Sequence, residues 1–481
     1  GYLDNIPLKR QETIGIVCFG DMVTNLTWYS MAQSILLRYN GYQSTLIIDT
    51  LKSFGSYIYF EGMEEVARVY IDYVVSVLKK KCSDIEVHYV TEEDVASLDE
   101  EDIQMTEKYA SLVVKWLDSR RDEVFLPEDN NRIKVAAEIL KSTLGSIKAY
   151  LEKNPYDTIN VYTGIHKHRC VYNYIGHKLG MRVSTYDGDE YDGGITFYDT
   201  DGVSGYAEDV KQILEKDLFT AGEKEKIIAL AKEHFESRRS STIKDAGYNY
   251  QIAGYSEQMV PYDIVFPMNI FWDSAALGRD DLFSDELNWL AETLEYIMKN
   301  TDATVLVREH PAQNTSDEFF YVDYSAMLPI LEEYKDRIHY AKSGEKLNTY
   351  QYVEKSKLIL PYTSTMGVES ALLGKNVILH TNVYYDNCGI AYKAKSKEDY
   401  FEKIKYYLVH TEEKTCKNPE NAYLAYYSQM KHFLPTRFSE CYTEWMDYDL
   451  EQVNQMEGVQ KVLAVIARNE NSIVKSIREI L

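Results

Sequence analysis

The chain alternates short runs of apolar, often β-branched residues with longer segments in which apolar residues recur every three or four positions. A short apolar run is typical of a buried strand, and the longer spacing is typical of an amphipathic helix. Strands that alternate with helices favour parallel sheets, because each helix carries the chain back to the start of the next strand. The pattern therefore predicts an α/β protein.

The expected elements fall into two series. The first has strands at 14–18, 45–48, 86–90, 159–162 and 182–185, with helices at 22–39, 63–80, 103–117, 132–153 and 169–179. The second begins after a helix at 221–239 and has strands at 263–267, 304–308, 337–340, 357–360 and 376–380, with helices at 285–300, 324–334, 347–354, 366–373 and 397–410. Helical spacing continues through the tail at 419–481.

A polar stretch at 240–257 separates the two series and indicates a domain crossover. We therefore expect two facing, doubly wound, Rossmann-like domains. The predicted divisions are 1–245 for the acceptor-side N-terminal domain, 246–415 for the donor-binding domain and 416–481 for helices that cross back to the first domain. Ligands of doubly wound sheets bind beyond the carboxyl ends of the strands, so we expect a site in the cleft between the domains.

Composition narrows the class of partner. The 481 residues are 45% hydrophobic and 27% charged, which is ordinary for a globular protein, and the net charge is −24. A surface that negative repels phosphate backbones, so nucleic acid is not an expected partner. The sequence has no apolar run long enough to cross a bilayer, and its first residues lack the layout of a secretory signal.

Cysteine and histidine usage predicts a cytoplasmic protein without a metal or a cofactor. The six cysteines lie far apart and form no CxxC pair, which is typical of a chain in a reducing compartment. The cluster His166-Lys167-His168 matches no common zinc spacing. The motifs GxSxG, P-loop and HExxH are absent from the sequence, so serine hydrolases, P-loop NTPases and zincins lose their main support.

The expected strand at 304–308 runs directly into Arg308-Glu309-His310-Pro311. The proline fixes the turn, and this would hold His310 and Arg308 in a defined direction at the carboxyl end of the strand. Imidazole there is suited to bonding a phosphate, and a guanidinium offers a fixed fork of donors. The alternative is structural: His310 bonds a neighbouring carbonyl, and Arg308 forms an ion pair with Glu309 or with another acid nearby.

The strand at 357–360 is followed by Thr363, Ser364 and Thr365, where a helix N-cap is expected. Hydroxyls, exposed backbone N–H groups and the positive end of the helix together favour phosphate binding. Glu369 lies one turn into that helix, on the side suited to a ribose. The alternative is that these residues only cap the helix.

The strand at 263–267 ends in an aromatic-rich loop that contains Asn269 and Asp273. These two side chains are suited to reading a base or a sugar edge. Equally, the loop's aromatic side chains would fill the core of the second domain.

In the first half, basic residues follow the strand at 159–162. His166, His168 and Arg169 would enter the cleft from that strand end, which makes them candidates for the acceptor side of the site. Asp21, which follows the strand at 14–18, is a candidate base, although an aspartate there commonly caps a helix.

Four carboxylates lie between Asp187 and Asp192, beside glycines. Among them, Asp189 and Glu190 are candidates for a general base whose pKa its neighbours would raise. The alternative is a solvated acidic loop.

Two of these stretches together resemble the bacterial capsule polysaccharide biosynthesis family, which includes β-Kdo transferases. The first is Asn269-Ile270-Phe271-Trp272-Asp273-Ser274 followed by Arg308-Glu309-His310-Pro311-Ala312. The second runs from Thr363 through Gly374 to Ile378. The His-Pro and Ser/Thr motifs also recur in bacterial sialyltransferases and teichoic-acid glycerophosphotransferases. The resemblance covers about 120 residues of the second domain, the length of the two stretches and the chain between them.

The resemblance implies a GT-B fold in which the second domain holds an activated donor and the acceptor approaches the first. It further implies that His310 and Ser364-Thr365 hold the donor phosphate, and that Glu369 and Asn269 contact the nucleoside. Tyr162 to His166 stands where the family has an Asn-Gly-Arg-like turn.

We therefore expect a metal-independent glycosyltransferase that moves a sugar from a nucleotide-activated donor, CMP-Kdo being an example, to a capsular or other surface polysaccharide. The partners would be that donor and a glycan or lipid-linked glycan, met in the cytoplasm or at the inner face of the membrane. The alternatives are a glycerol- or ribitol-phosphate transferase with a CDP donor, a UDP-sugar 2-epimerase, and a non-catalytic component of polysaccharide assembly.

Overall fold

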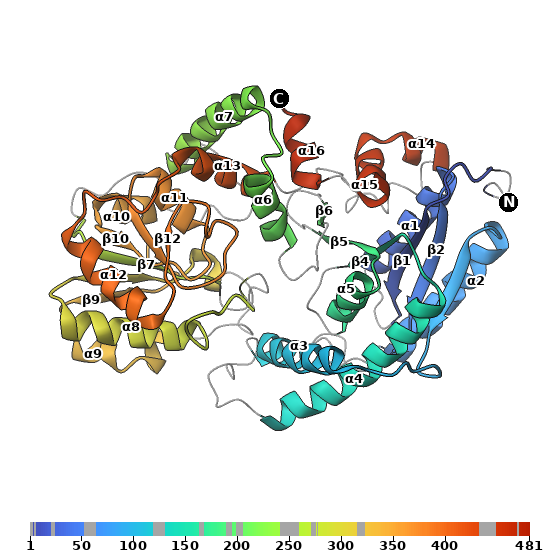
Figure 1. Ribbon diagram of the computed structural model, residues 1–481, viewed down its shortest axis with the longest axis horizontal. Coiled ribbons are helices and arrows are strands. Elements are labelled where there is room, and N and C mark those ends of the chain that lie inside the picture. The colour runs from blue at the N-terminus through green and yellow to red at the C-terminus, as the bar shows by residue number, and fades with distance from the viewer. Residues whose placement is uncertain are drawn as a thin grey trace. The chain divides into compact units, whose positions relative to one another are not determined.

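The computed structural model describes residues 3, 6–20, 25–51, 64–118, 130–162, 168–188, 195–198, 205–240, 259–270, 276, 278–314, 323–431, 449–468 and 471–481. These divide into two compact units (Figure 1). Unit 1 comprises Gly1–Leu117, Pro127–Asp209 and Lys431–Glu479, and unit 2 comprises Asp118–Leu126, Val210–Met430 and Ile480–Leu481.

Unit 1 is built on a six-stranded sheet of order β3-β2-β1-β4-β5-β6. Its strands are β1 (Thr13–Phe19), β2 (Gln43–Asp49), β3 (Glu86–Val90), β4 (Thr158–Tyr162), β5 (Arg182–Gly188) and β6 (Ile195–Tyr198). The first five are parallel, and β6 runs antiparallel to β5. The predicted strands of the first series are therefore confirmed, whereas β6 was not predicted.

The helices of unit 1 include α1 (Asn25–Tyr39), α2 (Glu64–Lys81), α3 (Glu100–Asp118), α4 (Asn130–Lys153) and α5 (Arg169–Lys178). An unpredicted helix, α6 (Gly205–Glu215), spans the boundary between the two units. The tail continues with α14 (Leu450–Gln455), α15 (Glu457–Arg468) and α16 (Ser472–Arg478), in red in Figure 1. Val462 and Ile466 of α15 lie in one apolar cluster with Ile14 and Ile16 of β1, so the helical tail packs on the first domain.

Unit 2 is built on a second six-stranded sheet, of order β12-β11-β10-β7-β8-β9. Its strands are β7 (Ile264–Pro267), β8 (Val305–Arg308), β9 (Ile338–Ala341), β10 (Leu358–Ile359), β11 (Asn376–Leu379) and β12 (Tyr392–Lys393). All neighbouring pairs are parallel.

The helices of unit 2 are α7 (Ala221–Arg239), α8 (Glu286–Asn300), α9 (Ile330–Glu333), α10 (Thr349–Lys355), α11 (Met366–Leu372), α12 (Lys397–Val409) and α13 (Pro419–Met430), with short 3-10 turns at Pro311–Asn314 and Tyr324–Met327. The predicted helix at 324–334 is thus a 3-10 turn followed by the short α9. Helix α7, expected in the first domain, packs in unit 2, because Phe235 contacts Tyr350 and Tyr426.

The two sheets share one topology. Counted from the first strand of each unit, both have the order 3-2-1-4-5-6, in which the chain winds outward in opposite directions from a central pair of strands. The prediction of two doubly wound, Rossmann-like domains with a helical tail is therefore confirmed. This topology opens a crevice where the winding reverses, at the carboxyl ends of β1 and β4 in unit 1 and of β7 and β10 in unit 2.

Candidate functional site

A reciprocal pair of hydrogen bonds bridges the crevice of unit 2. The Asn269 side-chain amide donates to the Thr363 hydroxyl at 2.7 Å, and the Thr363 backbone N–H donates to the Asn269 side-chain oxygen at 3.0 Å. Asn269 follows β7 and Thr363 follows β10, and both residues are half-buried. The structure thus brings together two residues from separate sequence motifs at the point where a doubly wound sheet binds ligands.

The strands behind this pair fix its position. The Met268 N–H donates to the Arg308 carbonyl at 2.9 Å, so the chain after β7 follows β8 for one residue beyond the strand. On the other side, Tyr362 is buried, and its hydroxyl donates to the carboxylate of Asp280. The Thr381 hydroxyl donates to the Tyr362 carbonyl. These bonds hold the two strand ends in register.

A buried carboxyl group lies directly behind Asn269. Glu286, the first residue of α8, accepts the Asn269 N–H at 3.2 Å, and the Tyr324 hydroxyl approaches its other oxygen at 3.5 Å. Burial raises the pKa of Glu286 to about 8, and the negative charges of Asp280 and Asp285 also raise it. The burial of this acid was not predicted, because an acid in the first turn of a helix ordinarily stabilises the helix dipole at the surface.

His310 follows the neighbouring strand β8, on the other side of β7 from Thr363. Burial lowers the pKa of its imidazole to about 4, and the positive charges of Arg308 and Arg238 contribute. At neutral pH the ring is therefore uncharged and has one N–H to donate. Pro311, which begins the 3-10 turn, and the bond from the Gln313 N–H to the His310 carbonyl at 2.9 Å fix the backbone there.

Arg308 and Glu309, at the carboxyl end of β8, bond the loop that follows β9. The buried Arg308 guanidinium donates to the carbonyls of Lys342 at 2.5 Å and Glu345 at 3.0 Å. Glu309 accepts the Ser343 N–H at 2.8 Å. The Arg308–Glu309 ion pair considered from the sequence is replaced by these bonds, which order the loop after β9.

In the turn before α11, one of the hydroxyl side chains caps a backbone N–H and another does not. The Ser364 hydroxyl accepts the Met366 N–H at 3.3 Å, whereas Thr365 makes no side-chain cap bond among the described residues. The Ser364 carbonyl accepts the Tyr385 hydroxyl at 2.8 Å. A Cβ on Gly367 would lie 2.0 Å from that hydroxyl oxygen, so the turn requires glycine at this position.

Glu369 lies inside unit 2 rather than at its surface. Its side chain is buried, accepts the Tyr350 hydroxyl at 2.8 Å and pairs with Arg238 of α7, whose Nε lies 3.4 Å away. These contacts join α7, α10 and α11.

In unit 1, His168 and Arg169 begin α5 and are both buried. The carboxylate of Asp49, at the end of β2, accepts His168 Nε2 at 2.9 Å and the Tyr172 hydroxyl at 2.7 Å. The Arg169 guanidinium lies over the rings of Phe19 and Tyr162, 4.7 and 4.6 Å from their centres. The structure therefore places both basic side chains among interior partners at the carboxyl edge of the sheet.

The other residues singled out from the sequence lie outside the described part of the chain. They are the candidate bases Asp21, Asp189 and Glu190, the acceptor-side His166, and Asp273 of the donor loop.

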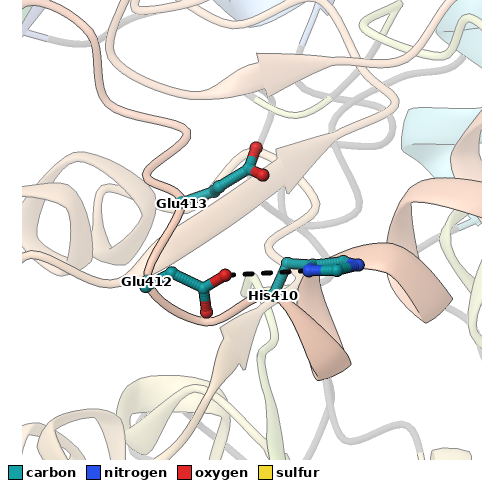
Figure 2. A group of neighbouring side chains, drawn as sticks. All are labelled: His410, Glu412 and Glu413. Carbon is teal, nitrogen blue, oxygen red and sulfur yellow. Dashed lines mark ion pairs between the residues drawn. The ribbon is translucent and has the colours of Figure 1, made fainter.

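Among the described residues, one group of side chains has the composition of a metal site: His410, Glu412 and Glu413, after α12 (Figure 2). The two glutamates are exposed, and Glu413 accepts the Tyr406 hydroxyl at 2.6 Å. The nearby Thr415 bonds Asn376, the first residue of β11, so the group lies at the amino edge of the sheet, opposite the Asn269–Thr363 pair. It contributes nothing to the candidate site.

No helix in the described ranges has both the length and the apolar character needed to cross a membrane.

Fold and site together define a two-unit α/β protein with the strand order of Rossmann-like ligand-binding domains. Residues 239–411 match the model of a family described as capsule polysaccharide biosynthesis protein. The resemblance predicted from the sequence is thereby confirmed for this range, which contains Asn269, His310, Thr363 and Glu369. A search of the curated proteins finds no match.

Several solved structures are similar to this chain. The β-Kdo 2,4 transferase KpsC of Thermosulfurimonas dismutans shares 14% identity over 56% of this chain and 79% of that chain, with a TM-score of 0.37. A glycosyltransferase from Rickettsia africae shares 10% identity over 96% and 100%, with a TM-score of 0.31. A UDP-GlcNAc 2-epimerase from Neisseria meningitidis shares 11% over 87% and 99%, with a TM-score of 0.24. Likeness at this level does not define an activity.

Proposed function

We propose that the protein is a glycosyltransferase of the GT-B type that transfers a sugar from a nucleotide-activated donor to a glycan of a bacterial surface polysaccharide. The observation that carries the proposal is the Asn269–Thr363 pair, which bridges the crevice of a doubly wound sheet within the segment that matches the capsule family. A CMP-linked sugar such as CMP-Kdo is the proposed donor, and a lipid-linked glycan at the cytoplasmic face of the membrane is the proposed acceptor.

In the proposed reaction, an acceptor hydroxyl forms a bond to the anomeric carbon of the sugar, and the bond from that carbon to the phosphate oxygen breaks. The nucleotide leaves with the bonding electrons, and the hydroxyl proton passes to a base of the first domain, for which Asp21, Asp189 and Glu190 are the candidates. His166, His168 and Arg169 are proposed to lie on the acceptor side. No metal ion is required in this scheme.

The leaving phosphate would lie between His310 and the turn at Thr363, Ser364 and Thr365. Because the pKa of His310 is about 4, we propose that the neutral ring donates an N–H to the phosphate and that Arg308 acts by ordering the neighbouring loop. Preorganised donors of this kind stabilise developing charge in the transition state.

The test is the substitution His310→Ala, assayed with CMP-, CDP- and UDP-linked donors and a glycan acceptor. We expect transfer to fall at least about 100-fold, which is the usual effect of losing one preorganised donor. His410→Ala, at the opposite edge of the sheet, is the matched control and should retain wild-type turnover. Wild-type activity of the His310 variant would remove this residue from the mechanism.

The nucleotide that the wild type releases separates the alternatives. CDP-glycerol or CDP-ribitol that yields CMP together with a phosphorylated acceptor would indicate a polyol-phosphate transferase. Isomerisation of a UDP-sugar without an acceptor would indicate an epimerase. A protein that binds none of CMP, CDP and UDP would be a non-catalytic component of polysaccharide assembly.

A further inference from the structure

The Asn269–Thr363 pair is held in place by a buried residue, Glu286, which is not among the candidate catalytic residues. The Asn269 N–H is bound by Glu286 at 3.2 Å, one residue beyond the Met268 N–H that is bound by β8. The Asn269 side chain then binds the Thr363 hydroxyl and N–H. One carboxyl oxygen of Glu286 therefore determines where the backbone of Asn269 lies, and with it the direction of the side chain that crosses the crevice.

We propose that Glu286 is a positioning residue of the donor site, holding Asn269 and Thr363 in the arrangement that a nucleotide phosphate ester binds. This inference rests on the proposed function, since it concerns the same crevice. Glu286 acts through Asn269 and need not touch the donor.

The surroundings of Glu286 determine whether its carboxyl group is protonated, and so whether a negative charge lies behind Asn269. The carboxyl group is buried, and it faces Asp280 of the preceding loop, Asp285 of the N-cap, and the hydroxyls of Tyr324, Tyr340 and Tyr362. Burial is the largest cause of the rise in its pKa to about 8, and the two aspartates add to it. Among the described residues, the Asn269 N–H and the Tyr324 hydroxyl favour the ionised form.

At neutral pH Glu286 is therefore mostly uncharged, and it accepts the Asn269 N–H without placing a negative charge behind the crevice. Above about pH 8 the group ionises. A buried anion next to the pair repels a phosphate ester, because charges in a medium of low dielectric constant interact strongly. Nucleotide affinity should fall accordingly.

The experiment titrates CMP, CDP and UDP calorimetrically into the full chain between about pH 6.5 and 9.5. For wild type we expect the affinity of the nucleotide that binds to fall about tenfold over this range. Glu286→Gln keeps an oxygen that can accept the N–H but cannot ionise, so its affinity should lack the fall that wild type shows above about pH 8. Glu286→Ala lacks the acceptor and should bind about tenfold more weakly than Glu286→Gln at every pH. Glu292→Gln, at a half-buried position of the same helix where the carboxylate pairs with Lys397, is the control and should keep the wild-type pH dependence.

Thermal unfolding of the same variants separates positioning from folding. Folding raises the pKa of Glu286 from about 4.5 in the unfolded chain to about 8. The folded protein therefore loses stability as the pH rises through this range, because the unfolded chain ionises the group more readily. Wild type should lose stability over this window relative to Glu286→Gln, with or without nucleotide. A folded Glu286→Ala variant with wild-type affinity, or a Glu286→Gln variant with the wild-type pH dependence, overturns the inference while leaving the proposed function intact. If wild type binds none of the three nucleotides, both proposals fail.

Discussion

His380 shows what burial does to a single titratable residue in this protein. Its ring stacks on Trp289 with centres 4.7 Å apart and meets the edges of Phe283 and Tyr400. Neither ring nitrogen has a hydrogen-bond partner among the residues that the structure describes. Burial lowers the pKa of His380 well below its usual value, and the charge of Lys393 adds to this effect. The residue is therefore neutral in the folded protein.

A neutral buried histidine makes the fold sensitive to acid. The unfolded chain takes up a proton at His380 below about pH 6.5, whereas the folded chain resists it, so stability is present above that pH and is lost as the pH falls. His380→Phe keeps an aromatic ring in the stack and removes the titrating group. We expect the melting temperature of the variant to fall less than that of wild type between about pH 7.5 and 5, by about 2 °C or more.

Thermal unfolding followed by circular dichroism measures this difference. His410→Phe, at a half-buried position, serves as the control and should keep the acid sensitivity of wild type. Equal losses in wild type and the His380 variant would show that His380 does not set the acid limit.

At the scale of elements, the turn between β10 and α11 depends on one close contact. Tyr385 donates its hydroxyl proton to the Ser364 carbonyl, and Gly367 leaves room for that ring against the first turn of α11. At the other end of the helix, Gly374 has a φ of +70°, which is the usual way to end a helix with glycine. Small residues at both ends thus allow this short helix to fit between β10 and β11.

Gly367→Ala tests this fit. The new methyl group would overlap the Tyr385 hydroxyl, so the ring must move and its bond to Ser364 breaks. We expect the free energy of unfolding to fall by about 1–3 kcal/mol, as for other overpacked sites. Gly222→Ala, where a Cβ meets nothing within 4 Å, is the matched control in α7. It should leave stability unchanged or slightly increase it, because alanine is the better helix former. Urea denaturation measures both, and equal stabilities of the two variants would contradict the prediction.

At the scale of the whole molecule, the strand order determines where an anionic donor can bind, whereas the net charge opposes its binding. A net charge of −24 repels an anionic donor, so binding has to come from local groups at one sheet edge. The carboxyl edge of unit 2 collects Thr363, Asn269 and His310 from three neighbouring strands, β10, β7 and β8. The amino edge of the same sheet carries His410 and the exposed Glu412 and Glu413 instead.

Hydrogen exchange with and without nucleotide would locate the ligand on the molecule. We expect a bound nucleotide to slow amide exchange at 268–270, 309–310 and 362–367, since these turns lie at the carboxyl edge of unit 2. The segment 410–415, at the amino edge, should exchange at an unchanged rate and serves as the internal control. Protection of 410–415 without protection of the three turns would place the ligand elsewhere.

The sequence predicted a good part of this site, and the reason is local. Asn269, His310 and Thr363 each follow a strand whose apolar run is evident in the sequence, and parallel strands end at a common edge. What the motifs did not show is which partners the neighbouring side chains would find. Glu369 was predicted to face a ribose, yet Arg238, more than a hundred residues earlier in the chain, pairs with it in the interior.

Periodicity along the chain thus determined the strands, most of the helices and the doubly wound architecture, because these depend on residues within a few positions of one another. Tertiary structure alone decided that α7 packs with the second unit, that β6 runs antiparallel, that Arg308 bonds backbone carbonyls, and that Glu286 is buried behind Asn269. Burial and hydrogen-bond partners depend on segments distant in sequence, and the pKa values that control the chemistry of a site follow from them.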